Sequence, residues 1–260
     1  MKLEIISKIH KDSHAHESVI LIHGACMGAW VWEDNFLPYF HEKGFNVYAM
    51  SFRNHGQSDS LEPIRWLSVK SYVEDLAYVI SEINGPIHLI GHSMGGFVMQ
   101  HYLQKGSVNI KSATLLCSVP SHGLWRLIGN LIFHYPLYFL QSILTFSWLP
   151  VLKKQTTLQS VMFRLDIPKT KLKHYATLLK EESFLVFLQM VLLYLPKTFI
   201  PKVPIMIVGG EKDFLIPKED TIKMANTYKV EPFIVSGASH CLMLEEGWDA
   251  VAAKIYSFVK

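Results

Sequence analysis

Three residues with the side chains needed for covalent hydrolysis follow apolar segments of the chain, in the order Ser93, Asp213 and His240. A serine hydroxyl is a poor nucleophile at neutral pH, and a histidine within hydrogen-bonding reach can accept its proton and return it to a leaving group. A carboxylate can fix the tautomer of that histidine and stabilise the imidazolium. These residue types predict nucleophilic attack by Ser93, provided that the fold brings the three together.

Ser93 lies in the segment Gly91–Gly95 (GHSMG), directly after the apolar run of residues 87–90. In a G-x-S-x-G pattern the serine occupies a sharp turn from strand to helix, and glycines two residues to either side avoid collisions with neighbouring elements. The turn presents the hydroxyl beside the free N–H groups of the following helix. The pattern is short, however, and an ordinary Gly/Ser turn also fits it.

Apolar strands and amphipathic helices alternate through most of the sequence. Residues 18–23 (SVILIH), for example, form a largely apolar run, which is typical of a strand covered on both faces in a parallel sheet. Alternation with helices indicates βαβ units with right-handed crossovers. We expect strands at residues 3–9, 18–23, 45–50, 87–92, 110–117, 203–208 and 231–235, and helices at 30–40, 68–83, 94–105, 218–228 and 246–259.

The loops that follow parallel strands meet at one edge of a sheet. Ser93, Asp213 and His240 each follow a strand that we expect to be buried, so the sequence predicts that all three lie at this edge, where open α/β sheets place their sites. Serine, acid and histidine is also the chain order of triads built on such a serine turn.

The alternation stops at Pro120 and resumes at Val203. Residues 127–152 contain no Asp, Glu, Lys or Arg, and residues 184–195 are nearly as apolar. We expect a helical insertion packed over the end of the sheet, either buried against the core or lining an apolar pocket. The predicted domains are a core of residues 1–119 and 203–260 and a cap of residues 120–202.

Two membrane interpretations of this insertion stand beside the first. The uncharged run is long enough to span a bilayer, but polar residues such as Asn130 and His134 interrupt it, and an α/β pattern follows. The second membrane interpretation is shallow docking on a membrane surface. Arg126, Lys153 and Lys154 are basic residues that could flank such a docking segment.

The composition bounds the class of protein. The chain has 260 residues, half of them apolar, which is enough for one large α/β domain and excludes disorder. Its formal net charge of +3 is small and its basic residues are scattered, so we expect no nucleic-acid partner. The sequence gives no prediction of oligomeric state.

The cysteines and the N-terminal segment predict a location. Three separated cysteines favour free thiols in a reducing compartment over a disulfide framework. The first residues include acidic side chains and no long apolar stretch, so we expect no secretory signal and a cytoplasmic protein. Nearby, His10, His14 and His16 fit a solvated hairpin turn better than a metal site, because no cysteine or carboxylate array accompanies them.

Four separated motifs follow predicted strands: His23–Cys26 (HGAC), Gly91–Gly95 (GHSMG), Gly210–Asp213 (GEKD) with Pro217 after it, and Gly237–His240 (GASH). Together they resemble the α/β-hydrolase fold proteins of the serine esterase and lipase type, over essentially the whole chain. The resemblance implies an α/β protein with a mostly parallel central sheet, helices on both faces and a helical cap insertion. It implies neither a cofactor nor a metal ion.

By this resemblance Ser93 is the nucleophile, His240 the general base and Asp213 the acid that orients it. The oxyanion hole is formed by the backbone N–H groups of Ala25 and Met94. The expected reaction is hydrolysis of a carboxylic ester through an acyl-enzyme on Ser93. Because the insertion is apolar, we expect a small-molecule ester with an apolar group, of medium chain length or lipid-derived.

Other activities of the same fold stay open. Carbon–carbon bond hydrolases and hydroxynitrile lyases use the same triad, and the segment His23–Trp30 is similar to the plant methylesterase and hydroxynitrile lyase branch. Small aromatic or methyl esters therefore remain candidate substrates. A non-enzymatic member that binds a ligand usually lacks one triad residue, and all three are present here. A serine in place of an aspartate on the turn disfavours epoxide hydrolase and haloalkane dehalogenase chemistry.

Several neighbouring residues have a second interpretation. Glu211 lies two residues before Asp213 and is an alternative acid, although the family places its acid at the position of Asp213. No acid follows the strand ending at Cys117, where some members carry theirs. We expect His23 and His92 to hold loops rather than to act as bases.

Two more motifs receive structural interpretations. Cys26, beside the oxyanion loop, and Cys241, beside His240, are expected to be small buried packing residues. The segment Arg53–Ser58 is similar to the family's R-G-H-G-x-S loop, with Asn54 in place of the first glycine. We interpret this departure as structural.

Overall fold

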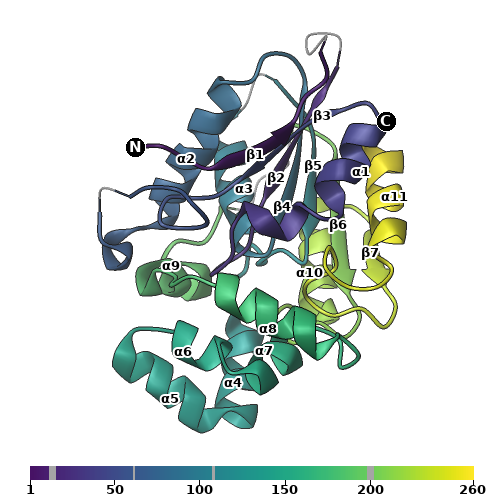
Figure 1. Ribbon diagram of the computed structural model, residues 1–260. Coiled ribbons are helices and arrows are strands. Elements are labelled where there is room, and N and C mark those ends of the chain that lie inside the picture. The colour runs from purple at the N-terminus through teal and green to yellow at the C-terminus, as the bar shows by residue number, and fades with distance from the viewer. Residues whose placement is uncertain (12–15, 61, 107–108, 198–201) are drawn as a thin grey trace.

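The computed structural model describes residues 1–11, 16–60, 62–106, 109–197 and 202–260 (Figure 1). Its strands are β1 Ile5–Lys8, β2 Ser18–Ile22, β3 Asn46–Met50, β4 Ile87–His92, β5 Ile110–Leu116, β6 Ile205–Gly210 and β7 Pro232–Val235. They form one sheet in the order β1-β3-β2-β4-β5-β6-β7. Only β1 runs antiparallel to its neighbour, so the mostly parallel sheet predicted from the sequence is confirmed.

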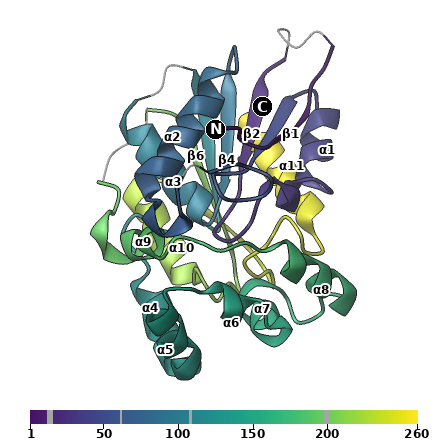
Figure 2. The same ribbon diagram turned by 60° about the vertical axis from the view of Figure 1, so that its left-hand side comes forward.

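Helices cover both faces of this sheet (Figure 2). Successive residues of a strand point to opposite faces, so Ile20 and Ile22 of β2 pack in one core layer while Val19 and Leu21 pack in the other. The first layer includes residues of α2 Val69–Ser81, α3 Met94–Gln104 and α10 Lys218–Tyr228, and the second includes residues of α1 Phe36–Glu42 and α11 Trp248–Val259.

The helix predicted at residues 30–40 is divided in two. A 3-10 helix, η2 Ala29–Trp32, is followed by a turn at residues 33–35 and then by α1. The turn residues Glu33, Asp34 and Asn35 explain the break, because Asp and Asn side chains compete with the backbone for helical hydrogen bonds. The Asn35 side chain instead donates to the Met243 carbonyl at 2.8 Å. A second 3-10 helix, η3 Ile64–Trp66, precedes α2.

Two predictions near the sheet edges need correction or lie outside the described residues. The last strand, β7, was expected to be buried, but it is half-buried along its length because it is an edge strand with β6 as its only neighbour in the described sheet. The hairpin turn around His14 falls at residues 12–15, which lie outside the described residues. The rings of His10 and His16, on either side of it, stack with centroids 4.2 Å apart.

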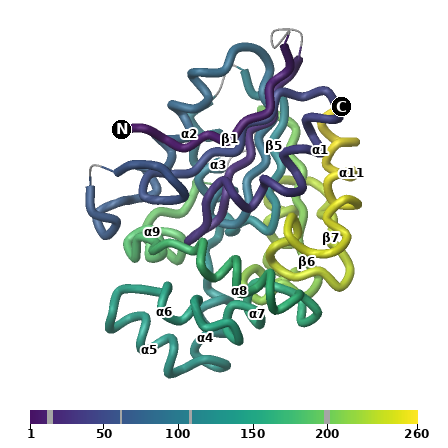
Figure 3. The backbone as a smooth tube through the Cα atoms, viewed as in Figure 1, coloured from purple at the N-terminus to yellow at the C-terminus, as the bar shows by residue number. Residues whose placement is uncertain are grey.

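The predicted helical insertion lies between β5 and β6. Its helices are α4 Trp125–His134, α5 Pro136–Thr145, α6 Leu149–Leu152, α7 Gln155–Met162, α8 Lys169–Leu178, α9 Phe184–Leu188 and the π-helix η4 Gln189–Leu193. In Figure 3 they gather at one end of the sheet, beyond the carboxyl ends of the parallel strands.

Backbone hydrogen bonds tie the insertion to the loops at this end of the sheet. The Lys180 N–H donates to the Cys26 carbonyl in the loop after β2, and the Cys241 N–H in the loop after β7 donates to the Met162 carbonyl. No single helix in the described part of the chain is long and apolar enough to cross a membrane. The pair α4 and α5 reaches that length and composition together, with a bend of 115° between them.

Candidate active site

Ser93 occupies a strained turn between β4 and α3. Its φ of 52° and ψ of −118° lie outside the regions that residues with a side chain normally adopt, at a cost of about 1–3 kcal/mol. The flanking glycines allow the turn to form. A Cβ on Gly91 would lie 2.8 Å from the Gly96 nitrogen, and one on Gly95 would lie 2.5 Å from the His23 carbonyl oxygen.

Asp213 and His240 form a buried pair at the same edge of the sheet. Asp213 follows β6 and His240 follows β7, and the His240 Nδ1 lies 2.8 Å from the Asp213 Oδ2, with both side chains at most 1% exposed. The other oxygen of Asp213 accepts the N–H groups of Leu215 and Ile216 at 2.9 Å each. An ionised carboxylate can only accept, so Nδ1 carries the proton and Nε2 is left as the basic nitrogen.

Ser93 and His240 are linked through His92. The His92 Nε2 lies 3.1 Å from the His240 carbonyl oxygen, and the two rings are 4.7 Å apart. Burial and the neighbouring His240 lower the pKa of His92 well below its ordinary value, so His92 is a neutral donor in this bond. The hydrogen bonds among the described residues join Asp213 to His240 but do not extend to the Ser93 hydroxyl.

Glu211, the alternative acid, faces away from His240. Its Oε2 accepts the Ser236 hydroxyl and the Gly237 N–H in an exposed turn. These two hydrogen bonds lower the pKa of Glu211. The geometry therefore pairs His240 with Asp213 and leaves Glu211 as a turn residue.

The N–H groups of Ala25 and Met94 are free to bind an anion. None of the hydrogen bonds among the described residues uses them, as expected for Met94 at the first position of α3. His23 holds the loop that carries Ala25, because its Nδ1 donates to the Gly24 carbonyl and its Nε2 accepts the Phe52 N–H. Burial, with the nearby His55, lowers the pKa of His23 to about 3, so the ring is neutral.

Glu182 forms a hydrogen-bonded cluster beside this loop that sequence reasoning missed. Its carboxylate accepts the Tyr72 hydroxyl at 2.6 Å, the His55 Nε2 at 3.1 Å and the Cys26 N–H at 3.3 Å, and it also accepts the Ser183 N–H at 2.8 Å. The cluster joins four separate segments of the sequence. It therefore anchors the insertion directly to the residue that follows Ala25.

The charge states of this cluster follow from its geometry. Burial by itself lowers the pKa of His55, but the charge and hydrogen bond of Glu182 outweigh it, and the net pKa is raised. Burial by itself raises the pKa of Glu182, but His55, Tyr72 and Ser183 outweigh it, and the net pKa is lowered. Glu182 and His55 thus form a buried ion pair below the pKa of His55.

The three cysteines are free, buried and protonated. Burial first, and nearby carboxylates second, raise the pKa of Cys26, Cys117 and Cys241 well above the ordinary value. These thiols therefore lack the thiolate character of a nucleophile. The Cys117 sulfur, an Asp213 oxygen and a His240 nitrogen lie within 4.8 Å of one another, which is close enough for a metal ion, but the Asp213 oxygens already accept three hydrogen bonds.

Asn54 adopts the left-handed backbone conformation, with a φ of 66°. Asparagine is among the residues that enter this region most readily after glycine. Its side chain also donates to the Glu62 carbonyl. The replacement of the first glycine of the R-G-H-G-x-S loop is thus accommodated by the backbone, in agreement with the structural interpretation.

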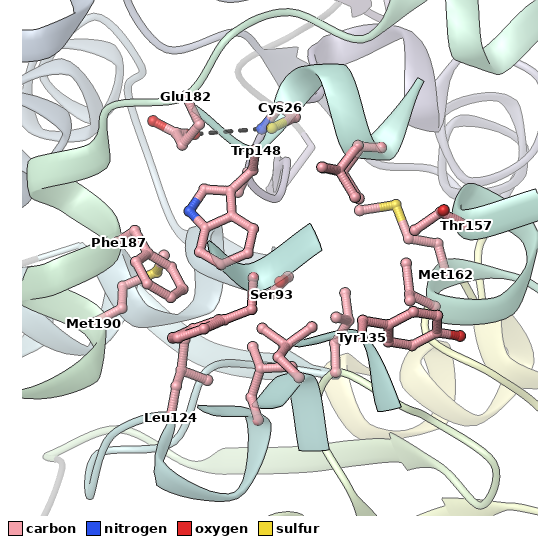
Figure 4. Close-up of a pocket in the computed structure, with 18 of the residues that line it drawn as sticks. Cys26, Ser93, Leu124, Tyr135, Trp148, Thr157, Met162, Glu182, Phe187 and Met190 are labelled. Atoms are coloured by element: carbon pink, nitrogen blue, oxygen red, sulfur yellow. Dashed lines mark hydrogen bonds between the residues drawn. The ribbon is translucent and has the colours of Figure 1, made fainter. Parts of the chain in front are cut away.

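An apolar pocket opens above Ser93. Figure 4 shows Ser93 in the middle of the lining side chains, with Phe187 and Met190 to one side and Tyr135 and Met162 to the other. Fifteen of the twenty-one lining residues come from the insertion, and Glu182 is the single charged residue among all of them. The insertion therefore supplies most of the wall of the pocket beside the serine.

Comparison with known proteins gives the family. A probable lysophospholipase L2 of Haemophilus influenzae is 26% identical over 131 residues, which are 48% of this chain and 41% of that protein. The chain therefore spans about two fifths of the length of this curated relative.

Solved structures share the fold at low identity. An esterase (EaEST) from Exiguobacterium antarcticum superposes with a TM-score of 0.76 at 17% identity, over 99% of this chain and 94% of that one. A monoacylglycerol lipase of Paleococcus ferrophilus superposes with a TM-score of 0.70 at 16% identity, over 100% of this chain and 98% of that one. The sequence profile of the Alpha/beta hydrolase family matches residues 19–254. The chain belongs to the alpha/beta hydrolase family.

Proposed function

We propose that this protein is a serine hydrolase that cleaves a carboxylic ester with an apolar group, through an acyl-enzyme formed on Ser93. The observation that carries the proposal is the buried Asp213–His240 pair at the edge of a sheet where Ser93 lines an apolar pocket. The esterase and the monoacylglycerol lipase that share the fold support the same class of reaction.

In the proposed reaction the Ser93 oxygen attacks the ester carbonyl while the His240 Nε2 accepts the hydroxyl proton. Asp213 keeps the proton on Nδ1 and stabilises the imidazolium. The Ala25 and Met94 N–H groups bind the oxyanion. The alcohol then leaves with the proton from His240, and a water, deprotonated by the same nitrogen, hydrolyses the acyl-enzyme. No cofactor or metal ion takes part in these steps.

Within this proposal the two predicted domains have separate tasks. The core, residues 1–119 and 203–260, carries Ser93, Asp213, His240 and both oxyanion donors. The cap, residues 120–202, selects the substrate, because it supplies most of the lining of the pocket. An apolar lining with one buried carboxylate favours an uncharged hydrocarbon group over a polar or anionic one.

The proposed location is the cytoplasm. Its support is that Cys26, Cys117 and Cys241 are all buried free thiols, the state that a reducing compartment maintains.

Chain length is expected to decide the turnover of p-nitrophenyl esters. The optimum of kcat/KM should lie at an acyl chain longer than acetate, because each further methylene buries apolar surface in the pocket. Leu131→Trp, which fills part of the half-exposed end of the pocket, should lower kcat/KM for the best long-chain ester by about tenfold or more. Acetate hydrolysis by the same variant is the control and should be nearly unchanged. An optimum at acetate would contradict a lipid-sized pocket.

Labelling by a fluorophosphonate probe, followed by a panel of esters, tests the reaction class. Labelling together with rapid ester turnover supports the proposal. Weak ester turnover beside rapid cleavage of a diketone or a cyanohydrin would replace it with the carbon–carbon bond hydrolase or hydroxynitrile lyase alternative. A folded protein that the probe does not label would point to ligand binding without catalysis.

A further inference from the structure

Exposed apolar side chains concentrate on the insertion. Of the eighteen large apolar side chains that are exposed among the described residues, twelve belong to the insertion. The most exposed of those in α4 and α5 are Phe133 at 82%, Leu137 at 78% and Leu144 at 70%. Soluble surfaces carry such residues singly, whereas a contiguous group of them marks an interaction site.

The helices α4 and α5 are apolar on two opposite sides. In α5, Tyr135 at its start, Tyr138 and Phe139 line the pocket, while Leu137, Leu140 and Leu144 are exposed at the spacing of a second helical stripe. In α4 the exposed large apolar side chains are Trp125, Ile132 and Phe133. We call the exposed side chains of Ile132, Phe133, Leu137, Leu140, Leu144 and Phe146 the outer face.

The outer face lies at the end of the molecule. Figures 1 and 2 both place α5 at the end of the insertion that is farthest from the sheet. The half-exposed end of the pocket is on the same helices, because Leu131, Tyr138 and Phe139 line it and are only partly buried, whereas Ser93 at the other end is buried. The outer face lies on the opposite side of these helices from the pocket.

The insertion is strongly basic. Residues 120–202 contain ten Lys or Arg residues and three Asp or Glu residues. The rest of the chain contains fifteen basic and nineteen acidic residues. One of the three acids, Glu182, is buried against His55. Lys153 and Lys154 are exposed just after α6, and the Lys154 Nζ lies 4.3 Å from the ring centre of Tyr138 in α5.

The exposed apolar side chains and the positive charge of the insertion together indicate what kind of partner it binds. A second copy of the chain would bring two basic insertions together, which repel each other. A bilayer that contains anionic lipids offers both an apolar phase for the outer face and negative charge for the flanking lysines. We propose that the outer face docks on the surface of an anionic lipid bilayer. The docking rests on exposed residues and charge; the proposed ester hydrolysis explains only why it would be useful.

Vesicle sedimentation tests the docking separately from catalysis. The protein, with Ser93→Ala to remove any turnover, is mixed with phosphatidylcholine vesicles with and without phosphatidylglycerol. Binding to the anionic vesicles, weakened by salt, is expected. Failure to bind them overturns the docking and leaves the proposed hydrolase intact, because activity is measured on a soluble ester.

Two sets of variants test the surface. Phe133→Ser with Leu137→Ser should weaken binding to anionic vesicles by about tenfold or more, because two large apolar side chains no longer enter the lipid. Lys153→Glu with Lys154→Glu should weaken it and reduce its dependence on salt. Trp66→Ser, which changes an exposed apolar residue outside the insertion, is the matched control and should bind as before.

Activity and oligomeric state complete the test. Neither pair of substitutions replaces a residue that lines the pocket, so both variants should hydrolyse a short soluble ester at the rate of the unchanged protein. If the variant with Phe133→Ser and Leu137→Ser bound vesicles as tightly as the protein without these substitutions, the docking would be overturned. A dimer in sedimentation velocity that this variant dissociates would overturn it in favour of a second copy as the partner.

Discussion

Ser93→Ala is expected to lower kcat for a short p-nitrophenyl ester by about 10⁴-fold or more and to abolish labelling by a fluorophosphonate. The reason is that the alanine leaves His240 with no hydroxyl to deprotonate, while the oxyanion donors and the pocket persist. Steady-state kinetics and labelling on a gel measure the two effects.

The fold of this variant should be unchanged. The Ser93 side chain makes no capping hydrogen bond to α3, and alanine tolerates the turn no worse than serine. The melting temperature should therefore match that of the unchanged protein. Ser81→Ala, at the exposed end of α2, is the control and should keep full activity. Labelling that survives in Ser93→Ala would refute the assignment of the nucleophile.

Glu182→Ala is expected to lower the free energy of unfolding by about 3–5 kcal/mol, because removal of one partner of a buried pair leaves the others without compensation. The Glu182 and His55 side chains are 3% and 0% exposed, so the groups that remain have little access to bulk water. The Tyr72 hydroxyl and the Cys26 N–H lose their acceptor as well. Urea denaturation measures the loss.

The pH dependence separates charge from packing at this position. The folded-state pKa of His55 is raised above 6.5. The contribution of His55 to folding stability is therefore complete below pH 6.5 and is lost as the pH rises through the raised value. The pKa of Glu182 is lowered below 4.5, so its contribution is full above pH 4.5 and is lost as the pH falls through the lowered value. The ion pair therefore contributes most between about pH 4.5 and 6.5.

Glu182→Gln is the matched variant, since it keeps the size and one acceptor oxygen but removes the charge. Its difference in stability from the unchanged protein should be largest between about pH 4.5 and 6.5 and should shrink above the pKa of His55. Glu181 is next to Glu182 in the chain and only partly buried, so Glu181→Ala should lower the free energy of unfolding much less. A difference that stays constant across this range would mean that the charge of Glu182 does not stabilise the fold.

The sequence predicts the core and its strand ends well because each motif is local. The turn at Ser93 needs particular glycines a fixed distance away, and the apolar runs of the parallel strands have few alternatives. The pairing of Asp213 with His240 follows because β6 and β7 are neighbours and both residues lie in the loops just after them. The exposure of β7 was not predictable from its own residues, since an edge position depends on the order of the whole sheet.

The insertion was predictable as helical but not in its details. Both sides of α5 are apolar, so the spacing of Tyr138 and Leu137 gives two stripes and does not distinguish the pocket side from the exposed side. The Glu182 cluster depends on His55 and Tyr72, which lie more than 100 residues away in the chain. One signal was available: an insertion with only three acidic residues places two of them, Glu181 and Glu182, just before a long apolar run.

The bonds between the insertion and Cys26 limit how this protein can be rebuilt. Both backbone groups of Cys26 are used by the insertion: its N–H by Glu182 and its carbonyl by the Lys180 N–H. A chimaera that exchanges residues 120–202 for the cap of another family member would therefore lose the support of the loop that carries Ala25 unless the graft ends before residue 180. Transplanting residues 120–179 alone keeps that support and still replaces most of the lining, so substrate range could be exchanged without disassembling the proposed catalytic centre.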